Sequence, residues 1–357
     1  MKKNVPSRKK IPFEISPEFS NYLRKCNRGT KLPLQYGDLL QYEASIPLYN
    51  EEGKDTLWET VFFAESAREE INNSLVRIYA LLKTDGDEEG LEHLSVARID
   101  FCQFGNTKPF RVRIINRLND NYDHFYVKQA DANRIYGLEL EYLLAPNRLL
   151  YLFDRKTLIE EHIPGIPGDD FFEREKNISP FNQIRIAKEF IKFNERCFIR
   201  LLGDMRAYNY VIDITPDIEG NQYRMRAIDF DQQSYEGRKN FYLPQYFKEN
   251  NPIVFLGIGS MTKETVHQYQ LEERSLVATR IKASRKRLRE LIDVMIKDTI
   301  SFPEKVNQLK HELAKHHKNK DYLKCQNMGE IVLMNIQLLI KKDFRKSTQF
   351  GEFFNKT

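Results

Sequence analysis

Apolar and polar positions alternate along two stretches in the first half of the chain. Residues 95–102 and 110–115 carry apolar side chains at every second position, and the turn-forming residues 105–109 lie between them. A period of two is typical of a strand with one buried face, so the pattern predicts an antiparallel hairpin. Residues 124–129 predict a third short strand that follows it. The first half of the chain is therefore expected to form an antiparallel sheet.

Apolar residues recur at helical spacing in other segments. Between Asp131, a suitable N-cap, and Pro146, which stops the pattern, the spacing predicts a helix whose apolar face includes Glu139 and leaves Glu141 outside it. Further helices are predicted at residues 67–82, 180–199, 272–299, 303–316 and 322–342. Further strand pairs are predicted at residues 149–153 with 158–163, and at 210–214 with 223–228.

This order of elements predicts an α+β protein with a sheet-rich first part and a mainly helical second part. A chain of 357 residues with 41% hydrophobic residues is long enough to bury more than one core. The basic tail at residues 2–10 and the acidic segment at residues 85–90 are expected to be disordered. No apolar run is long enough to span a membrane, and no signal peptide is recognised.

Charge and cysteine content add little to the picture. The net charge of +5 does not indicate any class of partner. The basic stretch at residues 280–289 is interpreted as a solvated helix face balanced by the 51 acidic residues, so a nucleic-acid partner is not expected. The four cysteines have neither disulfide-framework nor zinc-site spacing. Free cysteines fit a reducing compartment, so a cytoplasmic location is expected.

The candidate chemistry lies in residues 201–231. Asp204 is followed five residues later by Asn209, and Asp229 lies in a hydrophobic-Asp-Phe triplet beyond a predicted hairpin. Phosphoryl transfer from ATP needs one carboxylate to orient the attacking hydroxyl, and oxygen ligands that hold magnesium against the phosphates. These three residues are of the types that the reaction requires.

The spacing resembles that of the protein-kinase-like superfamily, in which H-R-D-L-x-x-x-N precedes D-F-G. Residues 203–209 keep the interval from Asp to Asn, and residues 227–231, Ala-Ile-Asp-Phe-Asp, stand where D-F-G would. Gly203 before the aspartate and Asp231 in place of the final glycine are more similar to aminoglycoside and choline phosphotransferases. The resemblance implies a two-lobed protein-kinase-like fold, with an antiparallel sheet and a helix in the N-lobe and a mainly helical C-lobe, flanked by an N-terminal extension and C-terminal helices. It also implies ATP and Mg²⁺ as cofactors.

Three features depart from the kinase pattern. Leu202 stands where the usual histidine would, and 20 residues separate Asn209 from Asp229, which the hairpin between them explains. The segment that would cover the phosphates, residues 104–109, has a single glycine, and only glycine allows the closest approach of backbone to phosphate.

The resemblance also assigns residues to the nucleotide. Lys128 ends the third strand, as the lysine of V-A-I-K does, and would hold the α- and β-phosphates with Glu139 as its partner. The connector between lobes would contact adenine through the backbone near Glu161, His162 and Ile163.

The remaining roles fall on residues 204–231. Asp204 would orient the acceptor hydroxyl, and Arg206 would stabilise charge on the transferring phosphoryl group. Asn209 and Asp229 would bind magnesium, and Asp231 would be either a further ligand or a helix cap.

The predicted organisation has four segments: an N-terminal extension at 1–94, the N-lobe and connector at 95–165, the C-lobe at 166–300 and a helical appendage at 301–357. The expected function is ATP-dependent phosphorylation of a hydroxyl group. A small-molecule acceptor is favoured over a peptide, because no A-P-E-like end of an activation loop follows Asp231. Two alternatives stay open: a kinase-like module that binds nucleotide or a partner without turnover, and a protein kinase with an unusual substrate.

Overall fold

The structure of the chain is a computed structural model that describes residues 10–84, 86, 91–104, 106–174, 178–218 and 220–341. The predicted basic tail up to residue 9 and most of the predicted acidic loop, residues 85 and 87–90, lie outside this range. The chain divides into two compact units, the first made of residues 1–132 and 149–162 and the second of residues 133–148 and 163–357. These boundaries differ from those of the four predicted segments.

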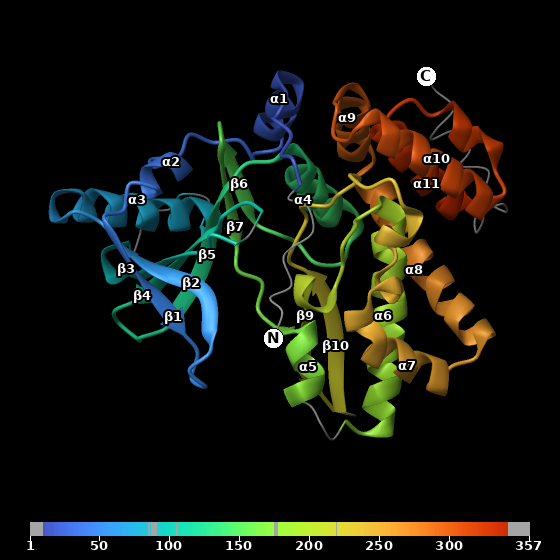
Figure 1. The fold of residues 1–357 in the computed structure, drawn as a ribbon, viewed down its shortest axis with the longest axis horizontal. Helices are drawn as coiled ribbons and strands as arrows, with labels where there is room; N and C mark the ends of the chain where they lie inside the picture. The colour runs from blue at the N-terminus through green and yellow to red at the C-terminus, as the bar shows by residue number, and fades with distance from the viewer. Residues whose placement is uncertain are drawn as a thin grey trace. The chain divides into compact units, whose positions relative to one another are not determined.

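The first unit is built on one antiparallel sheet with the strand order β1-β2-β3-β4-β5-β7-β6 (Figure 1). Its strands are β1 (Ala44–Tyr49), β2 (Asp55–Phe62), β3 (Leu94–Phe101), β4 (Phe110–Asn116), β5 (Tyr122–Gln129), β6 (Tyr151–Asp154) and β7 (Thr157–Glu161). The predicted hairpins β3–β4 and β6–β7 both form. Strands β1 and β2 come from the predicted N-terminal extension, so that segment continues the sheet.

Strand alternation gives the sheet two chemically different faces. One face is apolar and packs beneath α2 (Tyr36–Leu39) and α3 (Glu65–Lys83); Val112, Phe125, Val127 and Ile159 belong to its core. The residues between them, such as Arg111, Tyr126, Lys128 and Glu160, point to the opposite face. Helix α1 (Pro17–Lys25), capped by the side chain of Ser16, completes the unit.

The second unit is mainly helical. Its helices are α4 (Ala132–Leu144), α5 (Gly168–Arg174), α6 (Pro180–Arg200), α7 (Asn251–Ser260), α8 (Lys263–Ala283), α9 (Arg285–Lys297), α10 (Pro303–His317) and α11 (Met328–Lys341). A small sheet combines β8 (Ile166–Pro167), β9 (Tyr210–Asp217) and β10 (Gly220–Ala227), with β9 in the centre. Helix α6 lies alongside the β9–β10 hairpin (Figure 1), and the side chain of Ser179 caps its start.

Two predicted helices differ from the structure. The single helix expected at residues 272–299 is wrong: α8 and α9 are separate, and Ser284 between them leaves the helical conformation with φ −112° and ψ 25°. The helix expected from residue 322 is also wrong in its first turn, where a 3₁₀ helix (Lys320–Lys324) precedes α11.

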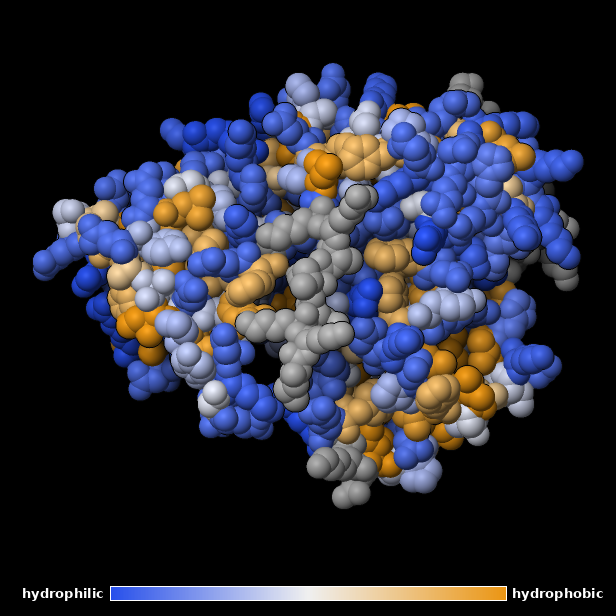
Figure 2. Space-filling model, viewed as in Figure 1, coloured by the Kyte–Doolittle hydropathy of each residue, from blue (hydrophilic) through white to orange (hydrophobic). Residues whose placement is uncertain are grey.

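The sequence pattern did not predict α7. Its Phe255 and Ile258 are exposed, and Figure 2 shows apolar residues gathered over this part of the surface.

Helix α4 is buried on all sides rather than on one face. Every residue from 132 to 141 is buried, including both glutamates, so the expectation that Glu141 lies outside the buried face is wrong. Its carboxylate forms an ion pair with Arg200 of α6, whose side chain is only 2% exposed. Glu139 is fully buried and accepts from Nε of Arg287 at 3.1 Å and from Nη2 at 2.7 Å. Buried charges are tolerated when they are paired in this way.

The fold class is confirmed as α+β. An antiparallel sheet dominates the first unit and helices dominate the second, with α4 inserted between the third and fourth strands of the predicted N-lobe, as in the kinase-like order. All four cysteines fall in described parts of the chain and are free thiols. Among the described residues, no helix is both long and apolar enough to cross a membrane.

We expect Glu141→Gln to lower the free energy of unfolding by about 3–5 kcal/mol, because it leaves the buried Arg200 charge without its counter-ion. The matched control is Glu290→Gln, which removes a carboxylate whose side chain is 41% exposed and should change stability by less than about 0.5 kcal/mol. Urea unfolding measures both variants. Equal small effects would mean that the Glu141–Arg200 pair does not stabilise the unit.

Candidate functional site

The turn after α6 places the first candidate residue in an unusual backbone conformation. We call residues 202–209 the Asp204 loop. Asp204 itself has φ +58°, in the left-handed region that side chains other than glycine seldom adopt. A Cβ atom on Gly203 would meet a ring carbon of Phe241 at 2.9 Å and the backbone oxygen of Gln232 at 3.1 Å. The glycine therefore lets the loop pack closely against residues 232–241, and backbone strain of this kind is often found at functional sites.

Asp204 lies in a partly buried environment that disfavours its charge. Burial is the largest cause that raises the pKa of Asp204 from 3.8 to about 6, with smaller increases from Asp229 and Glu249 that the hydrogen bond and charge of Arg206 oppose. A carboxylate with a raised pKa is a better proton acceptor near neutral pH than an ordinary aspartate. About a quarter of the Asp204 side chain is exposed, so an acceptor hydroxyl can reach it.

Arg206 is fixed beside Asp204 by three contacts. Its Nε donates to Oδ1 of Asp204 at 2.9 Å, and its Nη1 donates to Oε1 of Glu249 at 2.8 Å. The guanidinium carbon lies 5.0 Å above the centre of the Phe247 ring. An arginine held in this way keeps a positive charge in one place at low entropic cost.

The β9–β10 hairpin returns Asp229 next to Asn209. The backbone N–H of Ile228 donates to the backbone oxygen of Asn209 at 3.0 Å, directly before Asp229 in the chain. The amide Nδ2 of Asn209 donates to the backbone oxygen of Asp204 at 2.7 Å. Asp204, Asn209 and Asp229, which lie up to 25 residues apart in sequence, therefore share one site in the second unit.

A buried arginine bridges the two aspartates of the Asp-Phe-Asp triplet. Arg134, from the first turn of α4, places Nη1 2.9 Å from Oδ1 of Asp229 and 2.8 Å from Oδ1 of Asp231. Its Nη2 also donates to the backbone oxygen of Ile228 at 3.2 Å. The side chain of Arg134 is only 3% exposed. This guanidinium supplies a permanent positive charge where the sequence predicts a magnesium ion.

The donor set fits magnesium at two of the three predicted ligands. Asp229 is about one third exposed, and the hydrogen bond from Nδ2 of Asn209 leaves the amide oxygen of that residue to face a metal. Magnesium commonly takes one or two protein oxygens and completes its shell with phosphates and water. The side chain of Asp231 is 5% exposed and lies against Arg134, an arrangement that suits charge neutralisation. A metal role for Asp231 stays a prediction.

Two residues that the sequence did not indicate support the Asp204 loop. The first is Gln233, which donates through Nε2 to the backbone oxygens of Arg200 at 2.5 Å and Leu201 at 3.3 Å, directly before Leu202. Leu202, in the place of the usual histidine, is itself fully buried. Asn250 donates through Nδ2 to the backbone oxygen of Met205 at 2.9 Å. Both are buried amides in segments that carry no recognisable motif.

Lys128 lies on the polar face of the sheet in the first unit. Its Nζ is 2.8 Å from Oε2 of Glu160, which projects from the neighbouring strand β7. The same ammonium lies 5.0 Å from the centre of the Tyr126 ring. A lysine held between a carboxylate and an aromatic ring is positioned and charged, as phosphate binding requires. Glu160 was not among the residues that the sequence indicated.

The same face carries an aromatic and cationic cluster around Asp100. This carboxylate is 1% exposed and accepts from Oγ1 of Thr60 at 2.9 Å and from Nη2 of Arg111 at 2.8 Å. The guanidinium of Arg111 stacks 4.7 Å from the centre of the Trp58 ring. A flat ring beside an arginine offers both stacking and charge to a nucleotide.

The predicted pairing of Lys128 with Glu139 joins residues that belong to different units. Within the first unit Lys128 pairs with Glu160, and within the second Glu139 pairs with Arg287. The pairing of Lys128 with Glu139 stays a prediction. Arg287 also belongs to the basic stretch at residues 280–289, so at least this arginine serves an internal ion pair, and the interpretation of the whole stretch as a solvated face is wrong at that position.

The predicted adenine contacts follow the end of β7. The backbone N–H groups of Glu161 and His162 already donate to the backbone oxygens of Leu150 and His124, at 3.0 and 3.2 Å. The side chain of Glu161 accepts from the backbone N–H of Leu150 at 2.8 Å. Ile163 is buried and belongs to the second unit. Adenine recognition by Glu161, His162 and Ile163 stays a prediction, and it requires donors other than the two N–H groups already used.

We expect Asp204→Asn to remove a pH-dependent loss of stability. Because the pKa of Asp204 is raised from 3.8 to about 6 in the folded protein, the folded state holds this proton more tightly than the unfolded chain. Stability is therefore highest below the unfolded pKa and falls as the pH rises through about 6. The measured quantity is the free energy of unfolding of the variant minus that of wild type. This difference should be up to about 3 kcal/mol more favourable to the variant at pH 7.5 than at pH 3.5. Unfolding measured at both pH values tests this, and an equal difference at the two values would contradict it.

We expect Arg134→Gln to lower stability by about 3–5 kcal/mol, since it leaves Asp229 and Asp231 without their shared cation. Millimolar Mg²⁺ should recover part of this loss by binding between the carboxylates, and it should raise the melting temperature of the variant more than that of wild type. Arg174→Gln is the control, because the side chain of Arg174 is 64% exposed. Thermal unfolding in EDTA and in MgCl₂ provides the comparison. A response to Mg²⁺ no larger than that of wild type would show that the aspartates do not accept a divalent cation.

Comparison with known proteins gives little guidance. No protein-family model matches the chain, and no curated protein matches it. Among solved structures, one similar chain is described as "Crystal structure of Rad53 kinase domain and SCD2". The similarity covers 49% of this chain and 74% of that chain, with 16% sequence identity and a TM-score of 0.22. A similarity of this size is too weak to indicate a function.

Proposed function

We propose that this protein is an ATP-dependent phosphotransferase that acts on a hydroxyl group, with a small molecule as the favoured acceptor. The observation that carries the proposal is the grouping of Asp204, Arg206, Asn209 and Asp229 in one site, with burial raising the pKa of Asp204 to about 6. A proton acceptor, a fixed cation and two oxygen ligands are the parts that phosphoryl transfer needs.

Each residue has a role that follows from its contacts. Asp204 accepts the proton of the acceptor hydroxyl as that oxygen bonds to the γ-phosphorus of ATP. The bond from the γ-phosphorus to the β,γ-bridging oxygen breaks, and ADP leaves with the electron pair of that bond. Arg206, held by Asp204 and Glu249, offers positive charge to the phosphoryl oxygens. Asn209 and Asp229 would hold magnesium, which when bound offsets the charge of the phosphates. Within the first unit, Glu160 positions Lys128, and a role for Lys128 in phosphate binding stays a prediction.

A second function is a nucleotide-binding module without turnover. The bridge from Arg134 to Asp229 and Asp231 favours it, because a guanidinium already neutralises the carboxylate expected to hold magnesium. A permanent cation at that position lowers the affinity for a divalent ion by direct repulsion. The two functions differ in whether Asp204 is needed for chemistry.

Release of ADP and phosphate from ATP in MgCl₂ tests the proposal. We expect Asp204→Ala to reduce turnover by about 10²- to 10⁴-fold while nucleotide binding persists, since it removes the proton acceptor and leaves Arg206 its contacts with Glu249 and Phe247. Asp229→Ala should abolish magnesium-dependent ATP binding and turnover, since it removes the principal predicted metal ligand. Asp293→Ala is the matched control, because Asp293 is an exposed aspartate on α9 of the same unit.

The outcomes separate the two functions. Nucleotide binding without turnover, both alone and with a panel of small-molecule hydroxyl acceptors, would favour the module. Turnover that Asp204→Ala leaves unchanged would place the chemistry elsewhere and sink the proposal.

A further inference from the structure

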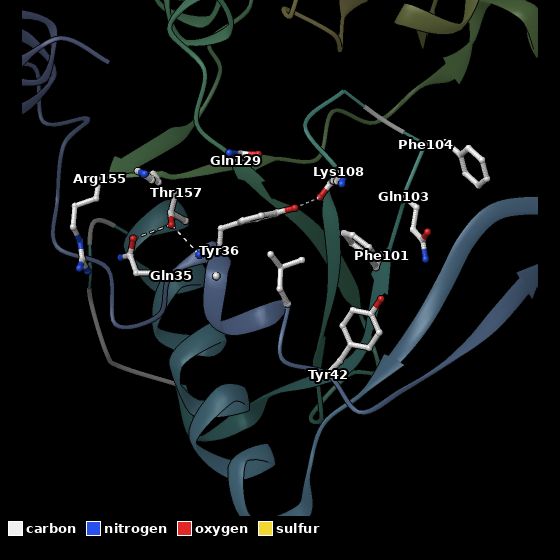
Figure 3. Close-up of a pocket in the computed structure, with 13 residues that line it drawn as sticks. Gln35, Tyr36, Tyr42, Phe101, Gln103, Phe104, Lys108, Gln129, Arg155 and Thr157 are labelled. Atoms are coloured by element: carbon white, nitrogen blue, oxygen red, sulfur yellow. Dashed lines mark hydrogen bonds between the residues drawn. The ribbon is translucent and has the colours of Figure 1, made fainter. Parts of the chain in front are cut away.

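The first unit contains a cavity of about 990 Å³ that the phosphotransferase proposal does not use. It lies beside α2, with Arg155 and Thr157 on one side of Tyr36 and Lys108 and Phe104 on the other (Figure 3). Its lining residues are Gln35, Tyr36, Gly37, Leu40, Tyr42, Phe101, Gln103, Phe104, Lys108, Gln129, Arg155, Lys156 and Thr157. The volume is at the upper end of the range typical of small-molecule sites.

Strand alternation places this cavity on the face of the sheet opposite Lys128. Gln129 shares its face with Phe125 and Val127 of the apolar core, whereas Lys128 points to the other face. Thr157 likewise shares the face of Ile159, and Glu160 the face of Lys128. A ligand in the cavity would therefore be separated by the sheet from one bound at Lys128.

The wall of the cavity is preformed by hydrogen bonds. The hydroxyl of Tyr36 donates to the backbone oxygen of Lys108 at 2.9 Å, and its backbone N–H donates to Oγ1 of Thr157 at 2.8 Å. Thr157 in turn donates to Oε1 of Gln35 at 2.8 Å, as Figure 3 shows. Tyr36 thus joins α2 to the start of β7 and to the β3–β4 turn. Lys108, whose backbone oxygen accepts from Tyr36, has a left-handed conformation with φ +41°.

The side chains around the cavity combine positive charge with aromatic surface. Lys108 comes from the β3–β4 turn, and Arg155 and Lys156 come from the β6–β7 turn. None of the thirteen lining residues is acidic. The lining also includes four aromatic rings, and Phe104 keeps 61% of its surface exposed. Cations beside exposed rings suit a ligand that has a flat ring and a negative group.

We propose that this cavity binds a small organic anion that consists of a planar ring system and a phosphate, sulfonate or carboxylate group. The ring would lie against Tyr42, Phe101 and Phe104. The anionic group would contact Lys108 and Lys156 at the two turns. Since the cavity lies on the face of the sheet opposite Lys128, such a ligand would bind without occupying the polar face.

Fluorescence titration of the full chain with 8-anilinonaphthalene-1-sulfonate, an aromatic sulfonate, tests the proposal. We expect saturable binding to the wild-type protein and at least a tenfold weaker Kd for the double variant Lys108→Glu, Lys156→Glu, because each change replaces attraction by repulsion. The matched control is Lys25→Glu, Arg68→Glu, which reverses two exposed charges of the same unit outside the cavity and should change Kd less than twofold.

Two further measurements complete the test. Phe104→Ala should weaken binding of the dye several-fold without unfolding the protein, because Phe104 is largely exposed. AMP should displace the dye and uncharged adenosine should not, both in wild type and in Lys128→Met. Unchanged dye affinity in the cavity variants would overturn the proposal. Loss of dye binding in Lys128→Met would also overturn it, since the dye would then occupy the polar face.

Discussion

The neutralisation of charge buried around α4 is the constraint on which the rest of the second unit depends. This helix carries Arg134, Glu139 and Glu141 into a region with almost no exposure to water. An unpaired buried charge costs several kcal/mol, so each must meet an opposite charge. Arg134 meets the Asp-Phe-Asp triplet, Glu139 meets α9 and Glu141 meets α6. These three pairs fix the helix against the segments that form the candidate site.

The same constraint shapes the chemistry of the site. Arg134 holds Asp229 and Asp231 in place, but it also supplies the charge that a metal ion would supply. The ionised form of Asp204, by contrast, destabilises the folded protein, because burial raises the pKa of this carboxyl group. Loss of stability at a functional residue is common, since the geometry that suits a reaction is seldom the most stable one. One site thus combines a neutralised acidic pair with a carboxylate ready to accept a proton.

The sheet of the first unit separates two kinds of binding surface. Its polar face combines Lys128 and Glu160 with Trp58 and Arg111, and nucleotide binding there stays a prediction. Its apolar face is covered by α2 and α3 over most of its area, and the cavity lies where this cover ends. Because side chains on neighbouring positions of a strand point to opposite faces, the eight-residue strand β5 contributes to both surfaces.

Much of the local structure was predictable from the sequence. The alternation in residues 95–102 and 110–115 predicts β3 and β4, and the helical spacing over residues 180–199 predicts α6. The interval from Asp204 to Asn209 predicts a loop that brings the two together, because five residues span a single turn. Local patterns depend on backbone conformation and on burial of one face, and both are written in neighbouring residues.

Only the tertiary structure decided which distant side chains meet. Nothing near Arg134 indicates that it reaches Asp229, 95 positions later, or that Arg287 pairs with Glu139. The helical period placed Glu141 outside the buried face, yet α4 is enclosed on every side and this glutamate pairs with Arg200. Glu160, Gln233 and Asn250 likewise lack any motif. Ion pairs and buried amides form between segments that folding brings together, so their partners depend on the packing of the whole unit, which residue order along the chain does not record.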